Sequence, residues 1–168
     1  MQRSGTRAGN PALREGLMMG IIVGIILLVG VLLGNLDTLA PLRTFSPLVS
    51  GLEFIVAMTL YLLAGLRVSQ QTGRVRTGAL AGLIAGLTAS LIKFTMASIL
   101  ILPHLDTMRQ HLFSQAPSGL ERQFATTPFI IGVLLFADGI GIVVEFALGA
   151  GAGAIGGLIG KRRVPVPT

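Results

Sequence analysis

Four long runs of apolar residues, separated by shorter polar segments, dominate the chain. They extend from about Leu17 to Leu36, Pro47 to Leu66, Thr77 to Leu102 and Pro128 to Ile159. A hydrocarbon core of about 30 Å requires about 20 apolar residues of helix, and each run is long enough. The pattern predicts an all-α membrane protein in which four transmembrane helices form an antiparallel bundle over residues 17–160.

Local signals refine the ends of these runs. Ser46 and Thr127 each stand before a proline, so that a hydroxyl N-cap precedes a proline at the first helical position. The fourth run would form about 48 Å of helix, which exceeds a single crossing. We therefore expect this helix to tilt, to break among Gly149–Gly157, or to project into the cytoplasm.

Basic residues cluster at alternate connections. The three groups are Arg3, Arg7 and Arg14; Arg67, Arg74 and Arg76; and Lys161, Arg162 and Arg163. The positive-inside rule then places the tails 1–16 and 161–168 in the cytoplasm and the loop 103–127 outside. We expect a multi-pass protein of the bacterial plasma (inner) membrane. Within the outer loop, residues 105–113 are either a short surface helix or a polar connector.

Composition supports a membrane environment and excludes several chemistries. Only 12% of residues are charged and the mean hydropathy is +0.80, whereas soluble domains carry about 25% charged residues. The net charge of +6 is explained by topology and predicts no nucleic-acid partner. The absence of cysteine excludes disulfides, thiolate metal sites and cysteine nucleophiles. His104 and His111 match no metal-ligand spacing, and no catalytic triad is visible, so we predict no enzyme, metal or cofactor.

Lys93 interrupts the third run about nine residues, or ~13 Å, from its outer end. A lysine at a helix centre costs roughly 2.5–3.5 kcal/mol, so a partner or a hydrated cavity is expected. Asp138 lies at the same predicted depth, which makes it the first candidate partner, and Glu53 is the second. A charge on another subunit is the third alternative.

Glu145 lies deeper, where we expect no basic residue, so it is either protonated or faces water or a partner. The cluster of Lys93, Asp138, Glu53 and Glu145 has two interpretations. It is an ion-paired group that fixes how the helices pair, or a site that handles protons or ions.

Small residues recur at helical spacing in the third and fourth runs. At 100° per residue, they share a side with Lys93 on one run and with Asp138 and Glu145 on the other. The glycines that we expect at close helix contacts are Gly78, Gly82, Gly86, Gly149, Gly153, Gly156 and Gly160. The sequence leaves open whether they contact helices of this chain, a second copy or another protein. Thr88 and Ser90 are expected to bond to carbonyls of their own helix.

Two functions follow from these features. The first is a non-enzymatic accessory or structural subunit, which packs through its glycine-rich faces against other membrane chains or a second copy in the lipid bilayer. The alternative is a small ion- or proton-coupled transporter or channel component that uses Glu53, Lys93, Asp138 and Glu145.

Overall fold

The described residues of the chain fold into four long helices. The computed structural model describes residues 10–36, 46–101, 105–106, 110 and 126–161. The helices are α1 (Pro11–Leu36), α2 (Ser46–Thr72), α3 (Val75–Ile101) and α6 (Thr127–Lys161). All four are long and apolar enough to cross a membrane. Over the described residues, the prediction of an all-helical chain with four such spans is confirmed, and it indicates a membrane-embedded, multi-pass protein.

Capping residues set where the helices begin. α2 and α6 begin at Ser46 and Thr127, as the proline signals predict. α1 begins at Pro11, about six residues before the apolar run. The side-chain Oδ1 of Asn10 accepts a hydrogen bond of 3.1 Å from the backbone N–H of Ala12, which makes Asn10 the N-cap. The helix therefore begins at a polar cap rather than at the edge of the apolar residues.

The α2–α3 connection is a tight turn. α2 continues to Thr72, past the end of its apolar run, and Gly73 follows with a positive φ of 66°. The Gly73 N–H donates to the Ser69 carbonyl at 2.8 Å. A glycine in the left-handed region is a common helix terminator because it carries no Cβ. α3 can thus begin at Val75, only two residues later.

α6 is one continuous helix of 35 residues, or about 52 Å. Of the three alternatives for its excess length, a break among Gly149–Gly157 is therefore wrong, because those glycines keep helical backbone geometry. Tilting and projection into the cytoplasm stay predictions. In the outer connection, Leu105, Asp106 and Gln110 are described and helical. The rest of the predicted 105–113 helix, together with His104 and His111, lies outside the described residues.

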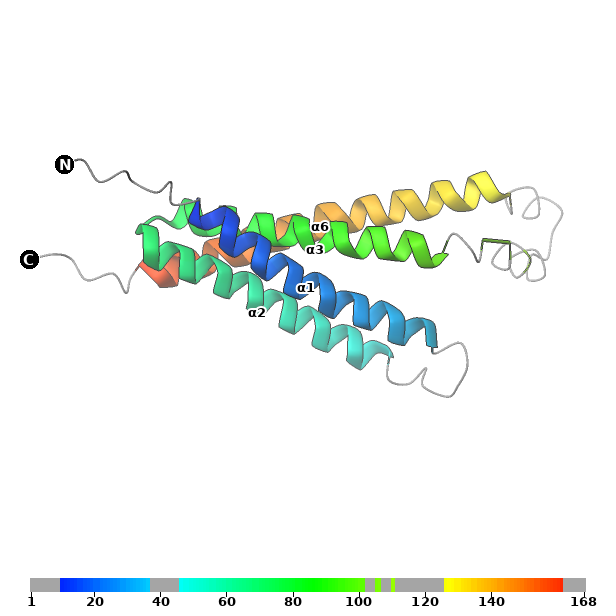
Figure 1. The fold of residues 1–168 in the computed structure, drawn as a ribbon, viewed down its shortest axis with the longest axis horizontal. Coiled ribbons are helices and arrows are strands. Elements are labelled where there is room, and N and C mark those ends of the chain that lie inside the picture. The colour runs from blue at the N-terminus through cyan, green and yellow to red at the C-terminus, as the bar shows by residue number, and fades with distance from the viewer. Residues whose placement is uncertain (1–9, 37–45, 102–104, 107–109, 111–125, 162–168) are drawn as a thin grey trace, which may run out of the picture.

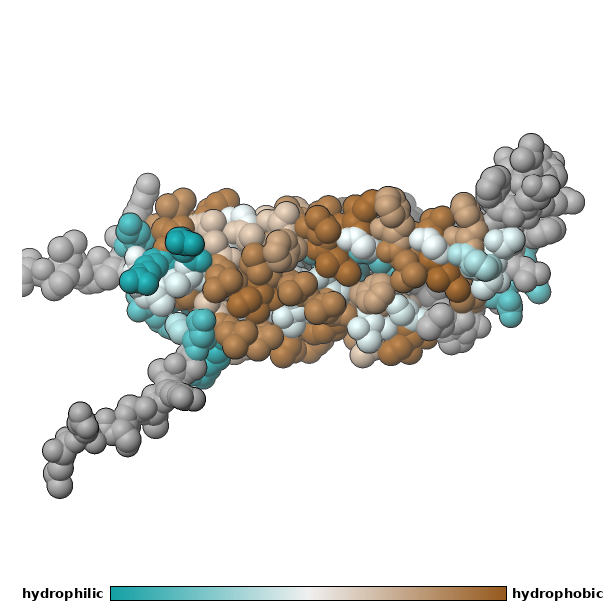
Figure 2. Space-filling view, turned by 90° about the horizontal axis from the view of Figure 1, so that it is seen from above, coloured by the Kyte–Doolittle hydropathy of each residue, from teal (hydrophilic) through white to brown (hydrophobic). Residues whose placement is uncertain are grey.

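Successive helices run in opposite directions along the long axis of the molecule (Figure 1). The first residue of α1 and the last residue of α6 therefore lie at the same end. α2 and α3 each pack against all three other helices, while α1 and α6 lie on opposite sides of that central pair. Figure 2 shows that apolar side chains cover the middle of the face in view and that polar ones gather toward its ends.

Small side chains form much of the core. Its members are Ala12, Met19, Val23, Ala57, Tyr61, Ala64, Val68, Ala81, Ala85, Ala89 and Ala152. Lipid tails are as apolar as a protein interior, so helices in a membrane associate largely through close backbone approach rather than through burial of large side chains. The small residues of this core allow the helix backbones to approach one another in this way.

Candidate functional site

An ion pair joins α3 to α6 in the middle of the apolar helices. The Lys93 Nζ lies 3.1 Å from the Glu145 Oε1 and donates a hydrogen bond to it. The Glu145 side chain is 18% exposed, but the Lys93 side chain is 42% exposed. The Glu145 side chain is therefore mostly covered by the chain, whereas a larger part of the Lys93 side chain is left uncovered.

The predicted Lys93–Asp138 pair is wrong, as is the expectation that no basic residue reaches Glu145. The register shows why. A Cβ on Gly86 would lie 2.6 Å from the Glu145 carbonyl oxygen, so these two residues oppose one another. Seven residues outward on each helix stand Lys93 and Asp138, whose backbones are thus level, as the depth argument predicted.

Side-chain direction decides the partner instead. In a helix each Cα–Cβ bond leans toward the N-terminus of that helix. Because α3 and α6 are antiparallel, Lys93 leans toward the Val75 end of the molecule, and Glu145 leans outward to meet it. The same rule tilts the Cα–Cβ bond of Asp138 outward, and its carboxylate forms no ion pair with Lys93.

Asp138 and Glu53 are close to the pair without joining it. Asp138 lines a cavity of about 20 Å³ together with Ser90, Lys93, Phe94, Gly141, Ile142 and Glu145. The Glu53 carboxylate of α2 packs against Gly30 of α1, where a Cβ would overlap it. Neither carboxylate forms an ion pair with a basic group of the described residues. The structure therefore brings Lys93, Glu145 and Asp138 around one cavity and places Glu53 between α1 and α2.

Two buried oxygens near the pair have no hydrogen-bond partner among the described residues. They are the Glu145 Oε2 and the hydroxyl of Tyr61, whose residue is only 2% exposed. A space of about 20 Å³ is sufficient for one water molecule when polar groups surround it. The site can thus hold one ammonium–carboxylate pair and a water or a proton beside it.

The seven predicted glycines all approach the backbone of another helix of this chain. On the α3–α6 face, Gly78, Gly82 and Gly86 oppose Gly153, Gly149 and Glu145 respectively. On the α2–α6 face, a Cβ on Gly156 would overlap the Leu62 carbonyl, and one on Gly160 would lie 2.6 Å from the Leu66 carbonyl. These glycine faces are therefore occupied within the chain.

Sequence reasoning missed two further sets of contacts. Gly16, Gly20 and Gly24 of α1 pack against α3, and Gly65 of α2 packs against Gly153 and Gly78. The spacing of four residues in the α1 set is the same signal that identified the other glycines. Gly65 stands in no such pattern, so only the tertiary structure reveals it.

The two hydroxyls beside Lys93 bond to their own helix, which confirms the prediction. The Ser90 Oγ donates to the Gly86 carbonyl at 2.9 Å, and the Thr88 Oγ1 donates to the Ile84 carbonyl at 2.8 Å.

Within the part of the chain that the structure describes, no group of three or more His, Cys, Asp or Glu could hold a metal. No protein-family model, curated protein or solved structure matches the chain.

Proposed function

We propose that this protein is a non-enzymatic subunit of the bacterial plasma membrane, in which a four-span antiparallel bundle with both termini in the cytoplasm packs against another membrane chain. The orientation is supported by the described basic residues Arg14, Arg67, Arg74, Arg76 and Lys161. They lie near the end where α1 begins and α6 ends. Cytoplasmic ends of membrane proteins are enriched in such residues.

Lys93, whose side chain is only partly covered by the chain, carries the proposal. It lies eight residues, or about 12 Å, from the end of α3, yet 42% of its side chain is uncovered. Hydrocarbon cannot solvate this charge, and such residues normally face a protein interior or a water-filled cavity. A neighbouring chain that covers Lys93 would supply that interior.

The balance of charge supports the same conclusion. Among the described residues in the middle of the four spans, Lys93 is the one base, whereas Glu53, Asp138 and Glu145 are acids. One ammonium group cannot neutralise three carboxylates. A basic or hydrogen-bonding group from another chain would complete the cluster, unless protons or water do so.

The outward face of α6 is the surface through which we propose that this contact is made. Only 6% of an 18-residue apolar segment of this helix is buried in the chain, compared with 39% for the corresponding segment of α1. Gly132, Phe136, Gly139 and Val143 fall on one stripe opposite Glu145. Phe136 and Val143 are 72% and 66% exposed, and a Cβ on either glycine would meet nothing within 4 Å. We therefore propose this stripe, instead of the glycine faces that already pack within the chain, as the surface that contacts another chain.

Site-specific crosslinking in native membranes tests the proposal. A photoreactive residue at Phe136 is expected to crosslink to a protein, either a second copy or another chain. The same residue at Ile25 of α1, which is 53% exposed, provides a matched lipid-facing control. Crosslinks from position 136 to lipid alone, together with a stable monomer in mild detergent, would exclude the subunit function.

Proton or ion coupling is the second candidate, and it is favoured by the buried oxygens of Tyr61 and Glu145 that find no hydrogen-bond partner in the described part of the chain. Intramembrane carboxylates are the usual relay groups of transporters. Flux into liposomes that contain the wild-type protein should then fall in Asp138→Asn and Glu145→Gln. Glu15→Gln, near the end of the bundle, is the control. Absence of wild-type flux, for the monomer and for any oligomer, would exclude this candidate.

A further inference from the structure

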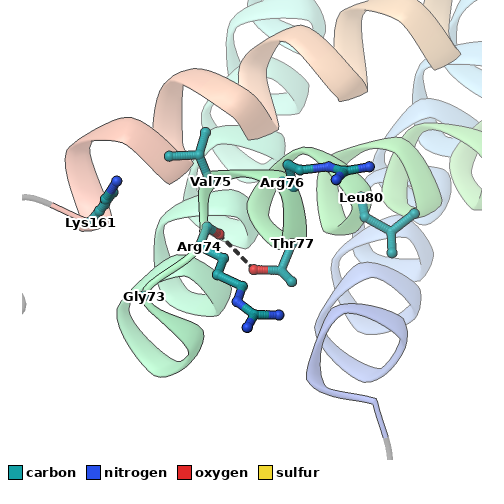
Figure 3. A pocket seen from close by; sticks show the side chains of 7 residues that line it. All are labelled: Gly73, Arg74, Val75, Arg76, Thr77, Leu80 and Lys161. Atoms are coloured by element: carbon teal, nitrogen blue, oxygen red, sulfur yellow. Dashed lines mark hydrogen bonds between the residues drawn. The ribbon is translucent and has the colours of Figure 1, made fainter.

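Three basic side chains surround a concave surface where the α2–α3 turn meets the end of α6. Arg74, Arg76 and Lys161 line a cavity of about 720 Å³ together with Gly73, Val75, Thr77 and Leu80. Lys161 lies on one side of Val75 and Arg76 on the other, while Arg74 projects from the turn (Figure 3). We call this cavity the basic pocket. Among the described residues no carboxylate lines it, and none pairs with its three basic side chains.

Backbone packing holds these cations in place. The Ser69 Oγ of α2 donates a hydrogen bond of 2.7 Å to the Gly157 carbonyl of α6, and Ser69 is fully buried. A Cβ on Gly157 would lie 3.0 Å from the Val75 carbonyl oxygen, so α6 also lies directly against the start of α3. Lys161, four residues further on, is thereby brought beside the turn. The packing of the fold thus sets the distance between the backbone positions that carry the three basic side chains.

The helix ends adjust how strongly each cation attracts an anion. The first turn of α3 contains no acidic residue, so the partial positive charge of its N-terminus adds to that of Arg74 and Arg76. Lys161 occupies the last turn of α6, where the partial negative charge of its own helix end offsets it. The two arginines therefore contribute most of the attraction.

An apolar stripe continues from the pocket along α3 toward the middle of the molecule. Arg76, Leu80, Leu87 and Leu91 are spaced by four, seven and four residues, which places them on one side of the helix. The three leucines are 41%, 37% and 49% exposed. A free phosphate would use only the cations, but a phospholipid would use both the cations and the leucines.

We propose that the basic pocket binds the headgroup phosphate of an anionic phospholipid, whose acyl chain lies along the leucine stripe. Basic pockets between helices at the cytoplasmic side of membrane proteins are suited to such headgroups. The attraction is electrostatic at the phosphate, and the apolar stripe holds the lipid parallel to α3. This inference depends on the four-span topology but not on either function proposed above.

Native mass spectrometry of the full chain in detergent tests the proposal. The probes are phosphatidylglycerol, phosphatidylcholine with the same acyl chains, and inorganic phosphate. Neutralising each arginine should weaken phosphatidylglycerol binding about fivefold, so Arg74→Gln/Arg76→Gln should weaken it about 30-fold. Arg14→Gln/Arg67→Gln removes two charges from the same end outside the pocket and should change binding less than threefold. Circular dichroism verifies that each variant remains helical.

Three results would overturn the proposal. The two double variants could weaken binding equally, which would indicate a general field rather than a site. Phosphatidylglycerol and phosphatidylcholine could bind equally well to the wild type. Finally, millimolar inorganic phosphate could displace the lipid completely, which would identify the ligand as free phosphate. Selective loss in the arginine variant, without displacement by phosphate, would support the lipid site.

Discussion

Replacing Gly82 with alanine should separate α3 from α6. A Cβ at this position would overlap the Gly149 carbonyl oxygen and would lie 2.7 Å from the Gly153 Cα. Both obstacles are backbone atoms, which cannot turn aside as a side chain could. The helices must therefore move apart by roughly 1 Å, and the neighbouring contacts at Gly78 and Gly86 would loosen with them.

The magnitude follows from two opposing effects. Alanine favours a helix over glycine by about 1 kcal/mol. Inserting a methyl group into a tightly packed interface costs about 1–3 kcal/mol, and here the loss extends over several contacts. We therefore expect Gly82→Ala to lower the free energy of unfolding by about 1–2 kcal/mol.

Gly151→Ala is the matched control on α6, because Gly151 lies outside the proposed contact stripe. A Cβ there would meet nothing within 4 Å, so only the gain in helix propensity applies. This variant should be unchanged or up to about 1 kcal/mol more stable. Both variants can be unfolded by increasing sodium dodecyl sulfate in mixed micelles and followed by far-ultraviolet circular dichroism. If Gly82→Ala proves as stable as Gly151→Ala, backbone contact does not hold α3 against α6.

Three further tests probe the interior with the same unfolding assay. Lys93→Met and Glu145→Gln should each destabilise the fold. Because the two side chains form an ion pair, a double-mutant cycle should give a coupling energy of about 1–2 kcal/mol between them. The cycle of Lys93→Met with Asp138→Asn should show less coupling, and equal coupling would contradict the observed pairing. Ser69→Ala should cost about 1 kcal/mol because it removes the buried bond to Gly157, whereas Thr59→Ala, whose hydroxyl bonds within its own exposed turn, should cost less than about 0.5 kcal/mol. Tyr61→Phe should change stability by less than about 0.5 kcal/mol, since its hydroxyl has no partner among the described residues; a loss above about 1 kcal/mol would reveal a bound water.

The sequence predicted the helices well because the relevant signals are local. Ser46–Pro47 and Thr127–Pro128 mark helix starts through backbone chemistry that needs no tertiary context. The beginning of α1 was missed because the prediction followed apolar residues, whereas the helix follows the Asn10 cap. The end of α2 was missed for the same reason, since polar residues continue the helix to Gly73.

The partner of Lys93 shows what depth alone cannot decide. Equal backbone height correctly matched Lys93 with Asp138, yet a lysine side chain extends several ångströms along the helix. The lean of Cα–Cβ bonds in antiparallel helices points to Glu145, and this rule was accessible from the sequence. The partners of the glycines were not accessible, because several helices offered suitable small residues and only packing selects among them.

The glycine contacts on two sides of α3 also bear on how the protein can move. Gly16 and Gly20 of α1 approach the Ala81 and Ala85 carbonyls, while α6 approaches Gly82 from the other side. The contacts on both sides of α3 are made by backbone atoms, which cannot change rotamer as side chains can. Small rotations or translations of α3 against α1 and α6 are therefore blocked. We therefore expect any conformational change to leave the segment around Ala81, Gly82 and Ala85 fixed. The ends of the helices that lie furthest from this segment would move most.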